Sequence, residues 1–400
     1  MDVVLSSAGR FHTFDLGRQL LRRGHLRRMY TAYPWWKVDA DLRPHARAFP
    51  WLMAVYMLSE RWKWYAVRDL VHWPLLDTYD RWVARQLEPC DVFVSLAGFG
   101  LHSHRRAKAL GAATVCDRGS CHIAVQEELL GEEHARHGLP FKPFDRRIVA
   151  KELQEYVEAD LITVPSSFAY RSYVAKGVPA EKLRKIPYGV DLSLFRPVPK
   201  EDGVFRVLYA GAMTLQKGVP YLLEALATLR LPNFELVLVG GLHDEVKPFF
   251  QRYEGGFRYL GFLPRTELYR VYSQASVFAM ASVHEGLALV QAQAMACGLP
   301  VVATTNTGAE DLFTDAVEGY IVPARDPVAL RQRVLYLYEH PDVREAMAQA
   351  AQRRVHALGG WDAYGALAVA TYRALLSEPL ARVESLTGGA GRVMHDESSA

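Results

Sequence analysis

The chain has 400 residues, half of them apolar and 23% charged, a composition typical of globular proteins that excludes disordered and fibrous classes. This length is too great for one core and predicts two domains of roughly 100–200 residues each. No apolar run approaches the roughly 18 residues of a membrane-spanning helix, and no basic segment precedes the apolar run at residues 3–5, so we expect a cytoplasmic protein without a signal peptide.

The net charge of +3 is unevenly distributed along the chain. Residues 1–200 hold 30 Lys and Arg against 22 Asp and Glu, whereas residues 201–400 hold 17 against 22. The first half therefore carries a net charge of +8 and favours an anionic surface or substrate. A solvated basic face is the alternative interpretation.

The alternation of short apolar runs with amphipathic stretches predicts an α/β fold with parallel sheets covered on both faces. In the first half, we expect strands at residues 2–6, 91–95, 113–116, 160–164 and 183–186, and helices at 13–23 and 166–176. In the second half, we expect strands at 205–210, 235–239, 257–260, 277–280 and 300–303, and helices at 218–229, 265–274, 286–296 and 327–339.

A linker rich in proline and charge at residues 195–203 divides the chain into two domains. We expect an N-terminal domain at residues 1–196 and a C-terminal domain at 203–358. A C-terminal helix within residues 359–380 follows a Gly-Gly break and packs back toward the first domain. Residues 385–400 are rich in Gly and Ser and predict a flexible tail.

Two polar loops follow predicted strands of the first domain, where open parallel sheets bind ligands. The first holds Gly9, Arg10 and His12, and the second runs from Asp117 to His122. We expect these side chains to face the gap between the domains. Helix capping or a buried structural role is the alternative for the residues of the second loop.

Seven of the eight tryptophans lie between residues 35 and 82, interleaved with basic residues. They are Trp35, Trp36, Trp51, Trp62, Trp64, Trp73 and Trp82, with Lys37, Arg61, Lys63 and Arg81 beside them. Such a mixture suits the interface of an anionic membrane, where the protein would meet a lipid-linked acceptor. An aromatic core covered by arginines is the alternative interpretation.

Two segments of the second domain suit a diphosphate ligand. Residues 209–218 follow a predicted strand, with Gly211 in position for a tight turn and Lys217 able to reach a phosphate. Residues 285–304 begin with Glu285, and Gly286 is expected to open a helix whose first amides bind an anion. A surface lysine and a helix-capping glutamate are the alternatives.

These two segments together resemble the C-terminal signature of retaining glycosyltransferase family 4. That family has the GT-B architecture, in which two Rossmann-like domains face each other, and it uses nucleotide-sugar donors without a metal. The resemblance implies that Glu285 contacts the donor sugar and that Lys217 binds the diphosphate. Gln293 stands where the family usually has a second glutamate, and Ala212 stands where a second basic residue is common.

The resemblance extends over residues 110–340 and assigns further positions. Residues 261–265 resemble the loop that frames the nucleotide base, residues 304–310 a small-residue loop, and the segments at 155–166 and 186–191 resemble fold markers of the family. The donor-binding set that it implies is Gly211, Lys217, Phe262, Leu263, Glu285, Gly286, Leu287, Ala288, Leu289 and Gln293. The expected catalytic set is Glu285, Lys217, Asp117 and His122, and the acceptor-side set is Gly9, Arg10, His12 and Arg118.

The expected activity is a retaining transfer of a sugar from a nucleotide-diphosphate sugar to a glycan or a lipid-linked acceptor, with no cofactor, no metal and no nucleic-acid partner. Four cysteines without CxxC spacing predict reduced thiols, and Asp39-Ala40-Asp41 is too small a set for a metal site. A nucleotide-sugar epimerase or hydrolase and a non-catalytic nucleotide-sugar-binding protein are the alternatives.

Overall fold

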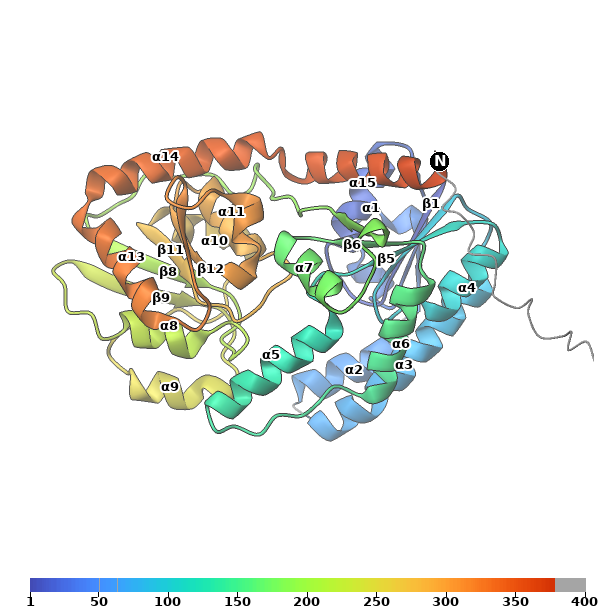
Figure 1. Cartoon of the computed structure of the whole chain (residues 1–400), viewed down its shortest axis with the longest axis horizontal. Helices are drawn as coiled ribbons and strands as arrows, with labels where there is room; N and C mark the ends of the chain where they lie inside the picture. The colour runs from blue at the N-terminus through green and yellow to red at the C-terminus, as the bar shows by residue number, and fades with distance from the viewer. Residues whose placement is uncertain (50, 63, 378–400) are drawn as a thin grey trace, which may run out of the picture.

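The computed structural model describes residues 1–49, 51–62 and 64–377, which form two parallel sheets flanked by helices (Figure 1). The N-terminal sheet has the order β3-β2-β1-β4-β5-β6-β7, with strands Ala46–Ala48, Leu26–Thr31, Val3–Ser7, Val92–Leu96, Ala113–Asp117, Leu161–Val164 and Leu183–Lys185. The C-terminal sheet has the order β10-β9-β8-β11-β12-β13, with strands Arg258–Tyr259, Phe234–Val239, Phe205–Ala210, Val277–Met280, Val301–Thr304 and Gly319–Val322. The predicted α/β class with two Rossmann-like domains is confirmed.

Helices connect the strands in both halves. Those of the first half are α1 Thr13–Arg22, α2 Trp51–Arg61, α3 Tyr65–Gln86, α4 Leu101–Ala109, α5 Ile123–Arg136, α6 Arg146–Glu158 and α7 Ser167–Ala175. Those of the second half are α8 Val219–Leu226, α9 Lys247–Arg252, α10 Arg265–Ser273, α11 Leu289–Ala296, α12 Ala309–Leu312, α13 Pro327–Glu339, α14 Pro341–Ala357 and α15 Gly360–Ser377.

The central strands formed where continuous apolar runs predicted them. Every residue of β4 and β8 is buried, which is the pattern of a parallel sheet covered on both faces. The prediction missed β2, β3 and β13. β2 carries two arginines, β3 has three residues at the sheet edge, and β13 begins with glycine, so none of them presents a long apolar run.

The chain crosses between the two halves twice, and the two crossings touch. A Cβ atom on Gly189 would lie 2.3 Å from the backbone of Gly360, so this contact needs glycine. Beyond it, α14 and α15 run along one side of both halves (Figure 1), and α15 packs against α1. Gly365 of α15 faces Gln19, and Arg23 is paired with Asp362 at 2.8 Å. The C-terminal helix thus rests on the first half of the chain.

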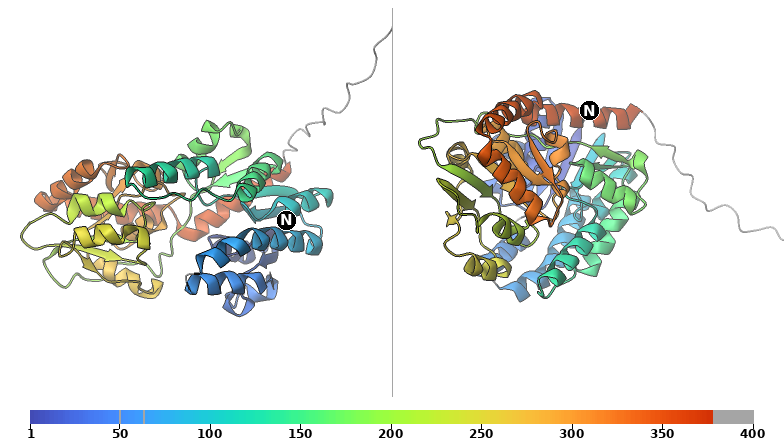
Figure 2. Two further views of the ribbon diagram at one scale, coloured as in Figure 1. Left: turned by 90° about the horizontal axis from the view of Figure 1, so that it is seen from below. Right: turned by 60° about the vertical axis from the view of Figure 1, so that its left-hand side comes forward.

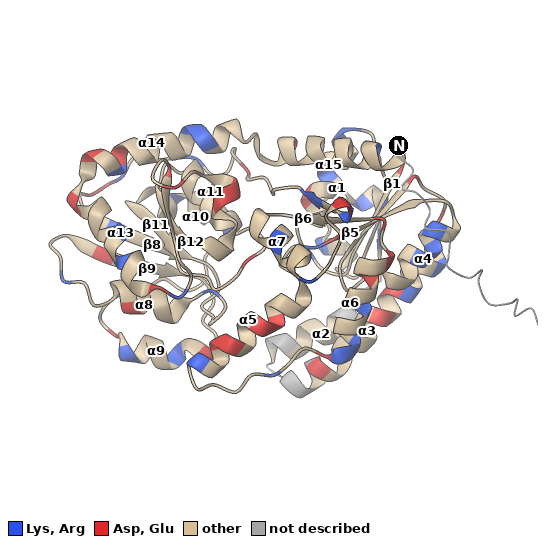
Figure 3. Ribbon diagram, viewed as in Figure 1, with Lys and Arg blue, Asp and Glu red and all other residues tan. Residues whose placement is uncertain are grey.

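The two halves also meet on the opposite side of the molecule, through α5 (Figure 2). Arg325 follows β13 and pairs with Glu132 and Glu133 near the end of α5, both at 2.9 Å. The acidic positions of α5 are coloured red on the ribbon in Figure 3. In a third place, Asp311 of α12 accepts hydrogen bonds from Ser167 and pairs with Lys185. These contacts hold the two sheets in one arrangement.

Residues 378–400, and with them the predicted tail at 385–400, lie outside the described residues. The predicted domain boundary at 196–203 falls between β7 and β8. Among the helices that the structure describes, none combines the length and apolar character needed to cross a bilayer.

Candidate active site at the domain junction

The segment after β11 lies directly against the N-terminal half. A Cβ atom on Gly286 would lie only 1.9 Å from the carbonyl oxygen of Gly119, and Ser166 donates a hydrogen bond of 2.5 Å to the Gly286 carbonyl. Only glycine fits this approach between two backbones. We call residues 118–121 together with 283–288 the domain junction.

The helix of this segment begins later than predicted. Gly286 was expected to open the helix, but α11 begins at Leu289, and Ala288 stands before it without a side-chain cap. The backbone of the intervening segment is held by the loop after β12: the Glu285 amide donates to the Asn306 carbonyl, and the Ala288 amide donates to that of Thr307. Gly286 therefore serves the close contact with Gly119, and the helix N-terminus lies three residues farther on.

Lys217 and Glu285 meet beside the junction. The Lys217 Nζ lies 2.5 Å from Glu285 Oε1, and the Ser282 hydroxyl donates to the same oxygen at 3.0 Å. Gly218 makes the meeting possible, because its positive φ and missing Cβ let the loop after β8 lie on the carbonyl of Ala281. The Glu285 side chain is 9% exposed and that of Lys217 is 27% exposed. The partly exposed Lys217 ammonium and the buried Glu285 carboxylate thus share one site.

A second polar group lies behind Gly119 in the N-terminal half. His12 Nε2 is 2.6 Å from Asp117 Oδ2, and the Thr163 hydroxyl donates to the other carboxylate oxygen at 2.8 Å. The Tyr188 hydroxyl lies 3.3 Å from His12 Nε2, and the two rings are in contact at a tilt of 31°, with centroids 4.3 Å apart. The structure therefore brings together two predicted residues, His12 and Asp117, within hydrogen-bond distance of each other.

His122 has the capping role that was the alternative for it. Its Nδ1 accepts a hydrogen bond from the Ala124 amide at the start of α5, and its ring packs between Tyr156 and Tyr173. Burial lowers the pKa of His122 to about 4, so the ring is neutral near pH 7 and able to accept this bond. Its position supports a structural role for this residue.

Arg118 and Arg10 are both engaged by protein groups. Arg118 donates to Gln126 at 2.8 Å, and its Nε lies 3.1 Å from Glu152. Burial is the largest single influence and opposes the charge, but the Glu152 carboxylate and the other groups around the guanidinium together raise the pKa of Arg118. Arg10 is paired with Asp39 at 3.0 Å, next to Gly9. Arg18 also pairs with Asp39, so this acid lies among arginines rather than in an acidic cluster, and the described residues hold no group of three or more metal-ligating side chains.

The other predicted donor-binding residues lie on the loops after β8 and β10, in the segment before α11 and in α11 itself. Gly211 directly follows β8, and Leu287 and Ala288 are buried at the junction. Phe262 is 80% exposed on the loop after β10, with Leu263 partly buried next to it. Gln293, in the second turn of α11, accepts a hydrogen bond of 3.3 Å from the Tyr272 hydroxyl. This bond occupies one acceptor position of the Gln293 amide, and a ribose hydroxyl would have to bind the positions that remain.

The sequence analysis missed His284 and Tyr188. His284 is buried at the junction with its Nδ1 4.0 Å from Cys121 Sγ, and burial lowers its pKa to about 4. Its place directly before Glu285 was a usable signal. Tyr188 contacts His12 from the first crossing segment, 176 positions away, and its signal in the sequence was its place in the fold-marker segment at residues 186–191.

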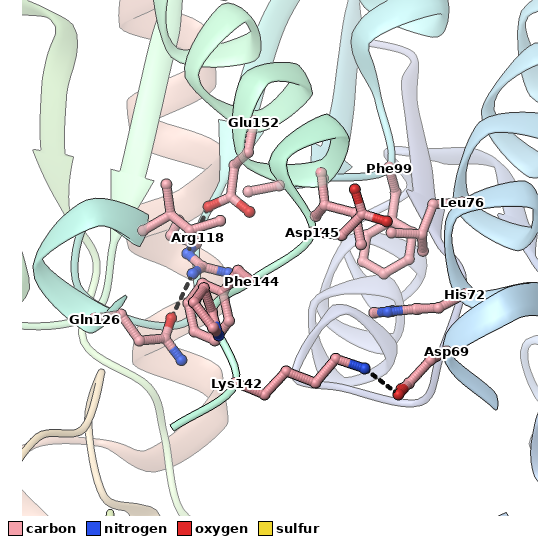
Figure 4. A pocket seen from close by; sticks show the side chains of 15 residues that line it. Asp69, His72, Leu76, Phe99, Arg118, Gln126, Lys142, Phe144, Asp145 and Glu152 are labelled. Atoms are coloured by element: carbon pink, nitrogen blue, oxygen red, sulfur yellow. Dashed lines mark hydrogen bonds and ion pairs between the residues drawn. The ribbon is translucent and has the colours of Figure 1, made fainter. Parts of the chain in front are cut away.

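A pocket of about 550 Å³ opens on the other side of Arg118 (Figure 4). Its walls come from α3, the loops after β4 and β5, and the segment that joins α5 to α6. Figure 4 shows Arg118 held between Gln126 and Glu152 at one side, and the Lys142–Asp69 ion pair at the other. Arg118, which lines this pocket, stands in the sequence between Asp117 and Gly119.

The C-terminal half matches a known family of sequences. Residues 193–354 match the family model described as glycosyl transferases group 1. A D-inositol 3-phosphate glycosyltransferase of Xylanimonas cellulosilytica is 31% identical over 219 residues, which are 49% of this chain and 52% of that protein. The GDP-mannose-dependent alpha-(1-6)-phosphatidylinositol monomannoside mannosyltransferase of Mycolicibacterium smegmatis is 29% identical over 232 residues, 51% of this chain and 59% of that one. The chain spans little more than half the length of these relatives.

Solved structures match over both halves. HepE of Anabaena, solved in complex with UDP, has a TM-score of 0.69 at 18% identity and covers 94% of this chain and 100% of its own. The sucrose-phosphate synthase of Thermosynechococcus elongatus has a TM-score of 0.68 at 22% identity, with 94% and 99% covered. The chain therefore has the GT-B fold, and the sequence matches support a glycosyltransferase.

Proposed function

We propose that this protein is a retaining, metal-independent glycosyltransferase that moves a sugar from a nucleotide-diphosphate sugar to a glycan or a lipid-linked acceptor. The observation that carries the proposal is the Lys217–Glu285 pair beside the glycine contact of the two halves. In a GT-B fold, this place lies at the carboxyl ends of the C-terminal strands, where open α/β sheets bind their ligands.

Lys217 acts on the leaving group. Its ammonium neutralises charge on the diphosphate as the sugar departs, and the uncapped start of α11 adds the positive end of a helix dipole. Because Lys217 is paired with Glu285 at 2.5 Å, a diphosphate competes with this carboxylate for the ammonium. Donor binding therefore frees an oxygen of Glu285 for a sugar hydroxyl.

The His12–Asp117 pair serves the same junction from the N-terminal half. Asp117 and Tyr188 fix the orientation of the imidazole, and the ring lies within 3.4 Å of where a Cβ on Gly119 would be. A ring held in this way can accept hydrogen bonds at a defined position next to the donor site. We also propose that His12 accepts or donates a proton during the transfer, and that the protein acts as a peripheral protein at the cytoplasmic face of a membrane.

Thermal-shift measurements against UDP, GDP, ADP and their sugars test the proposal directly. One of these nucleotides at about 100 times its dissociation constant is expected to add about 2.7 kcal/mol of stability. Addition of EDTA should leave this gain unchanged. A chain that no nucleoside diphosphate stabilises contradicts the proposal.

A further inference from the structure

Helix α6 buries two glutamates beside the loops that follow β4 and β5. Glu152 and Glu155 lie three residues apart on one face of this helix, and 3% and 0% of these residues are exposed. A buried carboxyl group is costly unless hydrogen bonds or an ion pair compensate for the lost water. The partners of these two groups therefore show what the helix holds.

Glu155 holds the loop after β4. Its two oxygens accept hydrogen bonds from the amides of Gly98 at 2.5 Å and Gly100 at 2.8 Å. Gly98 has a φ of 84°, and a Cβ atom on Gly100 would lie 1.8 Å from the Ser95 hydroxyl, so the loop needs glycine at both positions. Burial raises the pKa of Glu155 to about 8 against the effect of these two bonds, and the ionised group binds the amides most strongly.

Glu152 holds the loop after β5 (Figure 4). Its Oε1 lies 3.1 Å from the Nε of Arg118 and also accepts a hydrogen bond from the Tyr156 hydroxyl. Arg118 stands in the sequence between Asp117 of the proposed catalytic pair and Gly119 of the domain junction. A displacement of the Arg118 side chain would therefore shift the backbone on both sides of it.

The two loops are joined to each other. The amide of Ala97 donates a hydrogen bond of 2.9 Å to the carbonyl of Asp117. A Cβ atom on Gly98 would lie 3.5 Å from the Oε2 of Glu152, so the loop held by Glu155 also lies against the neighbouring glutamate. The two glutamates thus act on one connected unit of backbone, and Asp117 belongs to it.

Helix α6 has an anchor of its own. Lys151 forms an ion pair of 2.7 Å with Asp80 of α3, and the two side chains are 3% and 0% exposed. Asp80 also accepts hydrogen bonds from the amides of His102 and Ser103 near the start of α4. The two glutamates therefore project from a helix that is fixed against its neighbours, which the support of active-site loops requires.

A purely structural role is the alternative, and Asp160 is an example of one. Its carboxylate accepts hydrogen bonds from the amide and the hydroxyl of Thr114, both at 2.8 Å, and pairs with Lys108. Thr114 lies near the amino end of β5, and Asp160 directly precedes β6. Open α/β sheets bind their ligands at the carboxyl ends of the strands. Glu152 and Glu155 lie at that edge, whereas Asp160 lies at the opposite one.

We propose that Glu152 and Glu155 are positioning residues for the transfer reaction. By holding the loops after β4 and β5, they keep Asp117 and Gly119 in place beside the donor site, and each acts only through the loop that it holds. The role in the reaction rests on the proposed function, whereas the attachment of the loops does not.

Steady-state kinetics separate positioning from folding. The donor is UDP-glucose or GDP-mannose, whichever raises the Tm of the wild-type chain more, and release of nucleoside diphosphate is followed with methyl α-glucoside, methyl α-mannoside and water as acceptors. Glu155→Gln turns an amide group toward a backbone N–H, and Glu152→Gln loses the charge that attracts Arg118. Each variant should lower kcat about tenfold to 10²-fold, the cost of a misplacement of about 1 Å. The KM for the donor should stay within about twofold, because Lys217 and Glu285 lie in the other half of the chain.

Asp160→Asn is the matched control. It also removes a buried-edge carboxylate from a backbone amide, so it should lower the Tm as the glutamate variants do, but kcat should remain that of the wild-type chain. All variants are assayed well below their Tm. Wild-type kcat in both glutamate variants, or an equal loss of kcat in Asp160→Asn, overturns the proposal.

Amide hydrogen exchange tests the attachment of the loops without any substrate. Glu155→Gln should speed exchange in residues 97–101, and Glu152→Gln in residues 117–121, by at least about tenfold, while Asp160→Asn should leave both segments as they are. Unchanged exchange in the two glutamate variants overturns the attachment. If no nucleotide stabilises the wild-type chain, the proposed function fails and the role in transfer fails with it, but the exchange rates still decide whether the glutamates hold the loops.

Discussion

Replacement of Lys217 by methionine removes the charge of the proposed donor site and keeps most of the side-chain volume. Lys217→Met should lower kcat by about 10²–10³, the range for removal of one preorganised group that stabilises charge in a transition state. Nucleoside diphosphate should also stabilise the variant less, because the ammonium contacts the leaving group before the reaction as well as during it.

The same substitution has a cost in the free protein. Glu285 keeps only the Ser282 hydroxyl as a partner among the hydrogen bonds of its side chain, and it is 9% exposed. A hydrogen bond to a charged group is worth about 1.5–3 kcal/mol, so Lys217→Met should lower the free energy of unfolding by up to that amount. Glu285→Gln in the same background should recover part of the loss, because the amide carries no unpaired charge.

Lys247 provides the control for Lys217→Met. It pairs with Asp244 at 2.6 Å in the same half of the chain, but both side chains are more than half exposed. Lys247→Met should therefore change the free energy of unfolding by less than about 1 kcal/mol and leave kcat as it is. The decisive measurements are urea unfolding and steady-state turnover for both variants. Lys217→Met with wild-type turnover, whatever its stability, would refute the role of this lysine in catalysis.

Three further substitutions test the junction and the groups around it. Gly286→Ala should destabilise the chain by about 1–3 kcal/mol and reduce turnover, because the new Cβ meets the Gly119 carbonyl at 1.9 Å. Gly241→Ala is the control and should do neither, because nothing lies within 4 Å of its Cβ position. Equal unfolding curves for the two variants would contradict the contact. Asp117→Asn should lower kcat about ten- to hundredfold, because His12 loses a charged partner, and an unchanged pH–rate profile would argue against the pair. His122→Asn keeps a capping oxygen for the Ala124 amide but does not titrate. The pKa of His122 is about 4 in the folded chain and 6.5 ordinarily, so the unfolded chain takes up the proton first and wild-type stability is lost as pH falls from 6.5 to 4. The His122→Asn variant should lose less stability over this range. Identical slopes of unfolding free energy against pH would contradict the capping role of a neutral His122.

Lys217 and Glu285 were predicted from their places after strands and from the family resemblance. Lys217 and Glu285 are 68 positions apart, yet each follows the carboxyl end of a strand, and β8 and β11 are neighbours in the sheet. In parallel sheets, such ends meet at one edge. The strand order, which was not predicted, explains why these two loops meet.

The start of α11 could not be predicted in the same way. A glycine after a strand and before an amphipathic stretch is typical of a helix that begins at once, but Gly286 is fixed by Gly119, 167 positions earlier in the other half of the chain. Likewise, His122 has a chemistry that suits catalysis, and only its bond to the Ala124 amide shows that it caps a helix. A long-range contact decided the first case and a local side-chain-to-backbone bond the second, and periodicity carries no information about either.

The two halves of the molecule differ in what is known about the substrates they bind. The family match covers residues 193–354, which include Lys217 and Glu285 but none of the pocket beside Arg118. The sequence similarity therefore concerns the donor side, whereas the acceptor has to be inferred from the side chains of the first half. If the pocket binds the acceptor, a change at Ile148, which lines it, should alter the choice among acceptors and leave nucleotide binding alone, and a change at Lys217 should do the opposite. Substitutions that failed to separate in this way would show that the two halves recognise their substrates as one site.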